Sequence, residues 1–202
     1  MSPSSLRALA VAAVLGAALA ECGQSPSAGA PDGVPPNAII ESDRFTGVYD
    51  LVDTDGARVT QETAAGDVRI FYFGFARCPD VCPLALGTMS AALDVLSDAE
   101  RARVGAYFVT VDPEHDTTEE LKAFLSFDEN IRGLTGNADQ IEAAKAGFLV
   151  FARREEDPDF PGGYRMSHSS FFYLADETGR PLYAVRDSVS PDELASILRR
   201  NI

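Results

Sequence analysis

The chain has 202 residues, of which 46% are hydrophobic, and its 31 acidic against 17 basic residues give a formal net charge of -14. A chain of this length can bury one hydrophobic core, so we expect one domain rather than two. The negative charge and the lack of a basic cluster argue against binding to nucleic acid, because the phosphate backbone carries the same sign.

Residues 1–22 are predicted to be an export signal. Arg7 precedes an Ala-rich apolar run, residues 8–20, that is too short and too weakly hydrophobic for a typical membrane span. The run ends in a small-x-small pattern typical of simple cleavage, whereas Glu21 and Cys22 continue it like a bacterial lipoprotein signal in which Glu21 is the misfit. Two fates therefore stay open, cleavage or lipidation at Cys22, and both are favoured over an uncleaved anchor. Both export the protein to the periplasm, and lipidation would also tether it to a membrane.

Residues 23–39 are rich in Gly, Ser, Ala and Pro and lack apolar periodicity, which is typical of a flexible linker. The domain is expected to span residues 40–202. It opens with a predicted β-hairpin, in which residues 45–52 and 57–60 flank a turn that contains Asp55-Gly56.

The next segments predict an alternation of strands and helices. Residues 68–75 are nearly continuously apolar, as expected for a central strand covered on both faces. Further strands are predicted at 104–111, 131–134, 148–152, 169–175 and 181–185, an exposed loop or hairpin at 155–163, and helices at 84–96, 118–127, 138–147 and from 190 onward. Asn137 and Ser190 are the expected N-caps of the last two helices. The pattern predicts an α/β domain with a central mixed sheet flanked by helices.

Two cysteines follow the first long strand, in the loop Cys78-Pro-Asp-Val-Cys82-Pro. If Cys82 lies in the first turn of the next helix, the i and i+4 positions share a face, and the sulfurs of Cys78 and Cys82 can converge. The N–H groups of a helix start also favour thiolate over thiol. Converging sulfurs fit a disulfide switch, a soft-metal site or a buried structural pair. The flanking prolines and aspartate disfavour the buried pair, but the spacing does not choose between metal and redox chemistry.

The chain contains two histidines, His115 and His168. His168 immediately precedes the strand predicted at 169–175, at a sheet end where loops gather. Its residue type and position leave two interpretations open, a hydrogen-bonded edge histidine and a metal ligand. His115 lies in an acidic, Thr-rich loop and is expected to be a solvated surface residue.

Three segments in this order, residues 73–83, 111–117 and 168–174, resemble the Sco/SenC family of copper-binding cytochrome c oxidase assembly proteins. The resemblance implies a thioredoxin-like fold that binds one copper through Cys78, Cys82 and His168. It also implies that the protein delivers copper to, or reduces the cysteines of, the dinuclear copper site of oxidase subunit II. Other copper chaperones or thiol reductants would be further partners. Members of the family usually carry a membrane anchor, whereas this chain has only the short apolar segment before residue 22.

The chemistry of the donors agrees with this implication. Thiolates select Cu(I) and imidazole accepts both Cu(I) and Cu(II), so two cysteines and a histidine suit a site that handles both states, with Zn(II) as the main competitor. Asp112 is a candidate for supporting the ligands from outside the direct ligand set, although capping of its own loop is the simpler role.

Two alternatives use the same cysteine pair. The first is an extracytoplasmic thiol–disulfide oxidoreductase or peroxide reductase on the same scaffold, so that enzymatic activity stays an open question. Thioredoxin-like reductases, however, resemble one another in having two residues between their cysteines and a cis-proline before the strand that follows His168. Here three residues intervene, and Ser167 and Ser169 flank His168. The second alternative is a redox sensor whose disulfide state controls a partner.

Overall fold

The computed structural model describes residue 38 and residues 45–202. The predicted export signal, the linker and Cys22 lie outside the described residues, apart from residue 38. Fourteen elements follow in chain order: β1 (Asp50–Asp53), β2 (Arg58–Thr60), β3 (Val68–Gly74), α1 (Val81–Val95), α2 (Asp98–Arg101), β4 (Val104–Thr110), α3 (Thr118–Phe124), β5 (Ile131–Thr135), α4 (Ala138–Gly147), β6 (Ala152–Glu156), β7 (Tyr164–His168), β8 (Phe171–Asp176), β9 (Pro181–Arg186) and α5 (Pro191–Asn201).

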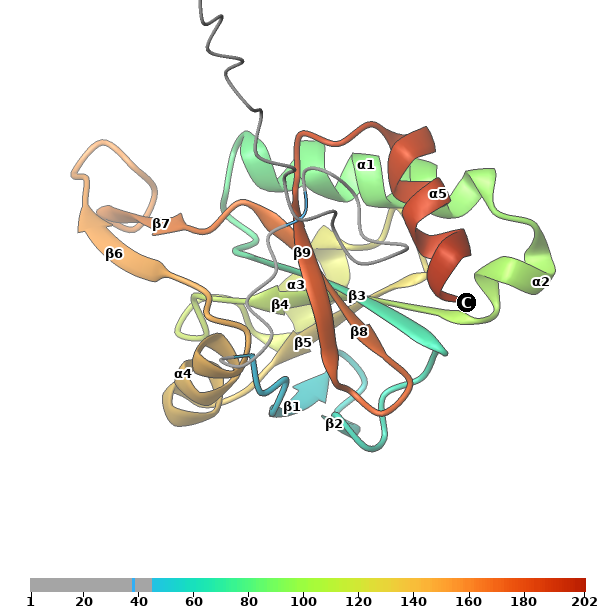
Figure 1. Ribbon diagram of the computed structural model, residues 1–202. Helices are drawn as coiled ribbons and strands as arrows, with labels where there is room; N and C mark the ends of the chain where they lie inside the picture. Colours follow the sequence, from blue (N-terminus) through green and yellow to red (C-terminus); the bar gives the residue numbers. More distant parts are fainter. Residues whose placement is uncertain (1–37, 39–44) are drawn as a thin grey trace, which may run out of the picture.

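A seven-stranded sheet with the order β2-β1-β5-β4-β3-β8-β9 forms the centre of the molecule (Figure 1). β3 pairs with β4, and β4 with β5, in parallel, whereas the remaining neighbours are antiparallel. The sheet is therefore mixed, and β1 and β2 form the predicted N-terminal hairpin. All residues of β3 are buried, as its continuous apolar sequence predicts for a central strand.

The helices cover this sheet. α1 and α5 pack against each other, α3 packs against β5, and α4 packs against β1 (Figure 1). The expected N-caps are present, because the Asn137 side chain accepts a hydrogen bond from the Gln140 N–H at 2.9 Å and the Ser190 hydroxyl accepts one from the Glu193 N–H at 3.3 Å. Among the helices of the described residues, none is long and apolar enough to cross a membrane.

The prediction of a strand at residues 148–152 is wrong. Phe148 is the C-cap of α4, Leu149 has a left-handed φ of 52°, and the Val150 N–H returns to the Lys145 carbonyl at 2.8 Å. The segment is apolar because Phe148 and Val150 are buried in the core at the end of the helix, not because it is extended. Strand β6 begins only at Ala152.

β6 and β7 pair antiparallel and form a separate two-stranded sheet, from Ala152 opposite His168 to Glu156 opposite Tyr164. The segment predicted as an exposed loop or hairpin is thus the distal part of this hairpin. His168 is the last residue of β7, whereas the sequence placed it immediately before the following strand, which starts at Phe171. Figure 1 shows the hairpin standing out from the main sheet beside the start of α1.

Candidate metal and thiol site

The two cysteines lie in the loop after β3 and at the start of α1. Cys82 is the second residue of α1 and is fully buried, and Cys78 lies in the preceding loop with 7% of its surface exposed. The Cys82 N–H points at the Cys78 sulfur at 3.5 Å. Asp80, at the N-cap, makes no side-chain cap, so the Cys78 sulfur takes the place next to the free N–H groups of the helix. The predicted convergence of the two sulfurs is confirmed.

The two thiols, which are both free, differ in acidity. A hydrogen bond from the Cys82 thiol lowers the pKa of Cys78 to about 4; burial opposes this shift, while His168 and the N–H groups of Asp80 and Cys82 support it. The same hydrogen bond and its deep burial raise the pKa of Cys82. At neutral pH the pair therefore holds one proton, with a thiolate at Cys78 and a thiol at Cys82.

The space for the Cys82 sulfur comes from Gly74, the last residue of β3. A Cβ atom at Gly74 would lie 2.7 Å from Cys82 Sγ and 2.9 Å from the Phe108 ring. Only glycine leaves room for a sulfur this close to the strand. The sequence contains this glycine at the end of an apolar run, but nothing in the pattern shows which side chain occupies the gap.

His168 brings an imidazole nitrogen to the sulfurs. Its Nε2 lies 3.5 Å from Cys82 Sγ, and its Nδ1 lies 3.0 Å from the Ser169 carbonyl oxygen. Because a carbonyl only accepts, Nδ1 donates to it, and Nε2 is the ring nitrogen that faces the sulfurs. Tyr72 and Phe75 pack against the ring edge-to-face, with centroids 6.1 and 6.0 Å away. The ring is thus oriented by one hydrogen bond and two aromatic neighbours.

Cys78 and His168 open into a cavity of about 370 Å³ between the thiol loop and β7. Apolar side chains, among them Phe75, Val81 and Phe160, line most of it. Cys82 is fully buried and does not line this cavity. A reagent or ion that enters from the cavity therefore meets the Cys78 thiolate and the imidazole first.

The three donors fit a soft metal in kind, since they offer two sulfurs and one imidazole nitrogen. Across the part of the chain that the structure describes, however, no three His, Cys, Asp or Glu side chains already stand in the arrangement of a metal site. Cys78, Cys82 and His168 contact one another instead. A metal would have to enter between them and displace the proton that Cys82 retains.

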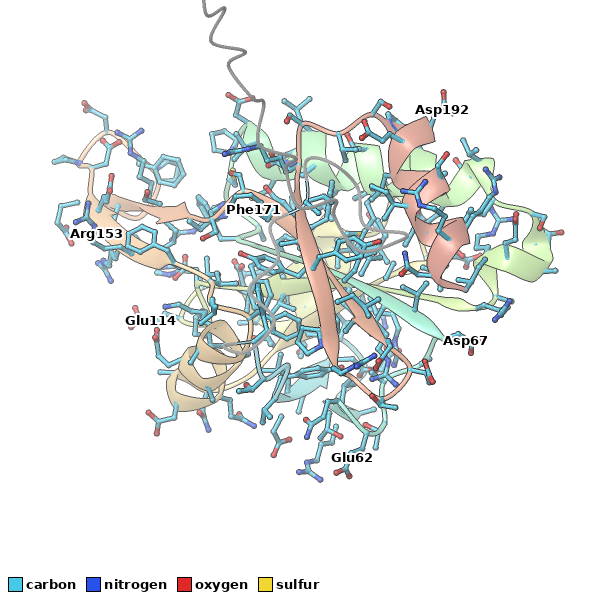
Figure 2. The ribbon with its side chains drawn as sticks, viewed as in Figure 1. Glu62, Asp67, Glu114, Arg153, Phe171 and Asp192 are labelled. Atoms are coloured by element: carbon cyan, nitrogen blue, oxygen red, sulfur yellow. The ribbon has the colours of Figure 1, made fainter. Side chains whose placement is uncertain are left out.

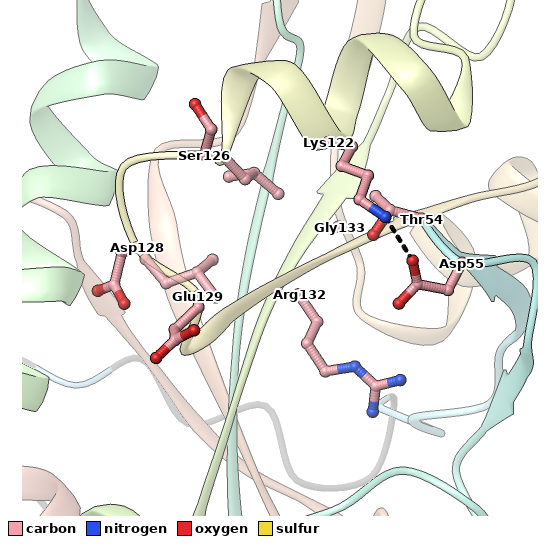
Figure 3. A pocket seen from close by; sticks show the side chains of 10 residues that line it. Thr54, Asp55, Lys122, Ser126, Asp128, Glu129, Arg132 and Gly133 are labelled. Carbon is pink, nitrogen blue, oxygen red and sulfur yellow. Dashed lines mark hydrogen bonds and ion pairs between the residues drawn. The ribbon is translucent and has the colours of Figure 1, made fainter.

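A larger cavity, of about 430 Å³, shares no lining residue with the cavity at the cysteines (Figure 3). It lies between α3, β5 and the β1–β2 turn, and among the described residues that line it there is neither a cysteine nor a histidine. Its cations are already paired, Lys122 with Asp55 at 2.7 Å and Arg132 with Asp53. We therefore place the chemistry at the smaller cavity, where the sulfurs lie.

Asp112 and His115 do not join the sulfurs. Asp112 is 4% exposed, and its carboxylate accepts hydrogen bonds from Arg77 Nη2 at 2.9 Å and from the Tyr164 hydroxyl at 2.7 Å. His115 contacts the same hydroxyl through Nδ1 and lies 3.5 Å from Asp112 Oδ1. The expectation of a solvated surface residue is thus wrong for His115, because its partly exposed ring is held by two buried groups.

Asp116 holds the segment before the cysteines, a role that its place in the sequence did not predict. This carboxylate is 1% exposed, and its Oδ2 accepts hydrogen bonds from the Ala76 N–H at 3.0 Å and the Thr110 hydroxyl at 2.6 Å. Burial raises its pKa to about 6, and its charge contributes to the raised pKa of Cys82. A carboxylate six residues after a Thr that ends a buried strand is a weak signal, because loops after strands are often acidic.

The comparisons with known proteins agree with the resemblance seen in the sequence. The profile of the family described as SCO1/SenC matches residues 37–202. A SCO2-like protein of Rickettsia felis is 33% identical over 166 residues, which are 82% of this chain and 80% of that protein.

Solved structures give the same result for the fold. Bradyrhizobium japonicum ScoI with copper bound has a TM-score of 0.71 at 33% identity, covering 78% of this chain and 99% of that chain. A SCO1/SenC family lipoprotein from Bacillus anthracis has a TM-score of 0.64 at 27% identity, covering 83% and 96%. The predicted thioredoxin-like fold is confirmed.

Proposed function

Because the chain belongs to the SCO1/SenC family, we propose that it is a copper metallochaperone that delivers copper to, or reduces the cysteines of, the dinuclear copper site of cytochrome c oxidase subunit II. One observation carries the proposal. Two distant segments bring the His168 Nε2 to 3.5 Å from Cys82 Sγ, and His168 and Cys78 line the same cavity.

Copper is the cargo of this site, and each donor has a separate part in holding it. Cys78 is already a thiolate, so it offers a charged soft ligand at the cavity without a proton to lose. Cys82 becomes the second thiolate when its proton leaves. His168 adds an imidazole nitrogen, which Cu(II) requires more than Cu(I) does, so the same three residues would hold both oxidation states.

The test of copper binding compares reduced and oxidised protein. With Cys78 and Cys82 reduced, we expect one copper per chain, because both thiolates are available; a disulfide removes both ligands. Copper is titrated into each form and counted by metal analysis, with Zn(II) as a competitor. Equal binding by both forms would exclude the cysteines as the copper ligands.

The test of the partner uses the soluble copper domain of an oxidase subunit II. Copper-loaded protein should transfer copper to that domain when its cysteines are reduced. Copper-free, reduced protein added to the oxidised domain tests the second part of the proposal, since only a reductase would produce free thiols there. In the native host, deletion of the gene should lower oxidase activity in copper-poor medium, and normal activity there would leave the assembly role without support.

We place the protein outside the cytoplasm, in the periplasm and on a membrane if Cys22 is lipidated. The short apolar run before Cys22 and the lipoprotein relative support this placement. The intact mass of the protein from its native host distinguishes the two fates, because an acyl group on Cys22 adds mass that simple cleavage does not. Protein that retains residues 1–20 would contradict both.

A thiol–disulfide oxidoreductase is the second candidate, and the unequal acidity of the two thiols favours it. The Cys78 thiolate would attack a partner disulfide, forming a mixed disulfide and releasing one partner thiolate. Cys82 would then attack Cys78 Sγ, so that the second partner sulfur leaves and the proton of Cys82 passes to a leaving thiolate. The products are a Cys78–Cys82 disulfide and a reduced partner. A redox sensor would use the same step with a different partner.

A further inference from the structure

The β6–β7 hairpin carries His168 but is separate from the main sheet. Among the described strands, β6 and β7 pair only with each other. His168 is at the end of β7 nearest the main sheet, so any rotation of the hairpin changes the position of its imidazole. Something other than strand pairing must therefore hold this hairpin against the thiol loop.

Arg77, the residue directly before Cys78, makes that connection. Its guanidinium donates from Nη1 to the Pro161 carbonyl in the hairpin loop at 2.6 Å and from Nη2 to Asp112 Oδ2 at 2.9 Å. It also lies over the Tyr164 ring, 4.9 Å from the centroid. One side chain thus joins the thiol loop to the loop after β4, to the loop at the tip of the hairpin and to Tyr164, the first residue of β7.

Tyr164 completes the connection from the hairpin side. It is 1% exposed, and its hydroxyl donates to Asp112 Oδ1 at 2.7 Å, the second oxygen of the carboxylate that Arg77 binds. The side chains of Arg77 and Asp112 are 24% and 5% exposed, so their ion pair is largely shielded from water and is stronger than a surface pair. The Arg154 guanidinium also packs on the Tyr164 ring, 3.6 Å from its centroid.

The hairpin loop is shaped to receive the guanidinium. Gly162 has a φ of +89°, and a Cβ atom there would overlap Arg77 Nη1. The backbone conformation requires glycine at this position, and the guanidinium occupies the space that a Cβ atom would fill. The Phe160 ring adds an apolar contact to the same loop, 6.3 Å from the Phe75 ring between centroids.

We propose that Arg77 is a positioning residue which, through Asp112 and Tyr164, fixes β7 so that the His168 imidazole stays beside the two sulfurs, and thereby sets how tightly the site holds Cu(II) relative to Cu(I). The inference rests on the proposed copper-binding function and adds a residue that touches no metal ligand by its side chain. Cu(II) loses affinity when the imidazole moves, whereas Cu(I) is satisfied by two thiolates. Loosening the hairpin should therefore lower the affinity for Cu(II) more than the affinity for Cu(I).

The test is a double-mutant cycle between Arg77→Gln and His168→Ala. Outer groups that orient a metal-bound histidine change affinity about 10- to 100-fold, so Arg77→Gln should weaken Cu(II) binding by about tenfold or more and Cu(I) binding by less than about threefold. In the His168→Ala background the same change should have little further effect on Cu(II). An unchanged loss in that background would mean that Arg77 acts by its charge on the sulfurs, and the proposal would be wrong.

Copper-free protein provides a second readout. Arg77→Gln should speed amide hydrogen exchange along Tyr164–His168, because the hairpin loses its attachment. Tyr164→Phe, which keeps the ring under Arg77 but loses the hydroxyl bond to Asp112, should show a smaller change of the same kind. Unaltered exchange in the Arg77 variant would also overturn the proposal. Both variants are first checked for a cooperative thermal transition, and Tyr164→Phe stands in for Arg77→Gln if the latter does not fold.

The matched control is Arg153→Gln, on the same hairpin. Arg153 lies on the outer side of the hairpin, away from the main sheet, with its side chain 67% exposed and paired only along its own strand with Glu155 at 2.8 Å (Figure 2). It should change neither copper affinity nor hydrogen exchange of β7. Failure of the copper-binding function is distinguished from failure of the Arg77 proposal by two measurements. If the wild-type protein binds no copper, or if His168→Ala does not change copper binding, the proposed function is wrong whatever Arg77→Gln does.

Discussion

The Cys82 sulfur lies directly against the backbone of Gly74, with no space for a Cβ atom between them: such an atom would be 2.7 Å from Sγ. The end of β3 therefore determines where the deeper of the two thiols can be. Gly74→Ala should push Cys82 away from Cys78 and His168, and it should lower stability by about 1–3 kcal/mol through overpacking. Copper affinity and chemical denaturation of the same preparation measure the two effects.

Gly87→Ala is the control for that substitution. Gly87 lies in α1 and is exposed, and a Cβ atom there would meet nothing within 4 Å. Alanine in an exposed helix interior stabilises by about 0.5–1 kcal/mol relative to glycine, so this variant should be slightly more stable and bind copper normally. If Gly74→Ala left copper binding at the level of Gly87→Ala, the role assigned to Gly74 would be wrong.

The acidity of Cys78 can be measured by alkylation. Its pKa is lowered to about 4 by the hydrogen bond from Cys82, so above that pH the thiolate is already formed. The rate of alkylation of Cys78 by iodoacetamide should be nearly constant from pH 5 to 7 and should fall below about pH 4. Peptide mapping should find Cys82 unmodified, because it is buried and its pKa is raised.

Denatured protein provides the reference for this profile. An ordinary thiol has a pKa of about 8.5, so its alkylation rate rises about tenfold per pH unit from pH 5 to 7. The alkylation rates of folded and denatured protein should therefore differ most at the lowest pH. A tenfold rise per unit in the folded protein would show that Cys78 carries a thiol at neutral pH.

Asp116 predicts a second pH dependence, this time of stability. Burial raises its pKa to about 6, above its ordinary value, so the folded state holds the proton more tightly than the unfolded chain does. The stability that the protonated Asp116 side chain gives the folded state is complete below about pH 4 and is lost as the pH rises through about 6. Asp116→Asn is neutral throughout, so its free energy of unfolding relative to wild type should improve by about 2–3 kcal/mol between pH 4 and pH 7.

Denaturant unfolding at several pH values measures this difference. Asp159→Asn is the matched control, because it makes the same replacement at an exposed position. A relative stability of Asp116→Asn that does not depend on pH would contradict the raised pKa. Only the pH dependence is compared, because Asp116→Asn also changes the stability at every pH by replacing the acceptor for the Ala76 N–H and the Thr110 hydroxyl.

Local patterns predicted much of this fold and part of the site. The strand at β3 follows from a continuous apolar run, and the approach of Cys78 to Cys82 follows from helix geometry, because both depend on residues close in sequence. The fold at residues 148–152 did not follow, since an apolar segment is buried equally well in a turn as in a strand. The spatial neighbours His168 and Cys82, or Arg77 and Tyr164, are brought together only by the complete topology.

Replacing each histidine separately distinguishes the two candidate functions. His168→Ala removes the nitrogen that faces Cys82 Sγ at 3.5 Å but leaves the hydrogen bond between the two thiols in place. We expect Cu(II) affinity to fall by more than the roughly 10- to 100-fold that loss of an outer group causes, and Cu(I) affinity to fall less, because the two thiolates remain. Disulfide formation and exchange by Cys78 and Cys82 should persist.

His115→Ala is the matched control, because His115 is the other histidine of the chain and contacts Tyr164 and Asp112 rather than the sulfurs. Because those two residues also hold the hairpin, Cu(II) affinity should fall by no more than the roughly tenfold expected for an outer group, and Cu(I) affinity should stay within about threefold of wild type. Titrations with Cu(I) and Cu(II) and a dithiol exchange assay on both variants complete the comparison. If His168→Ala kept its copper affinity but lost dithiol exchange, the imidazole would serve proton transfer, and the oxidoreductase would become the better explanation of this site.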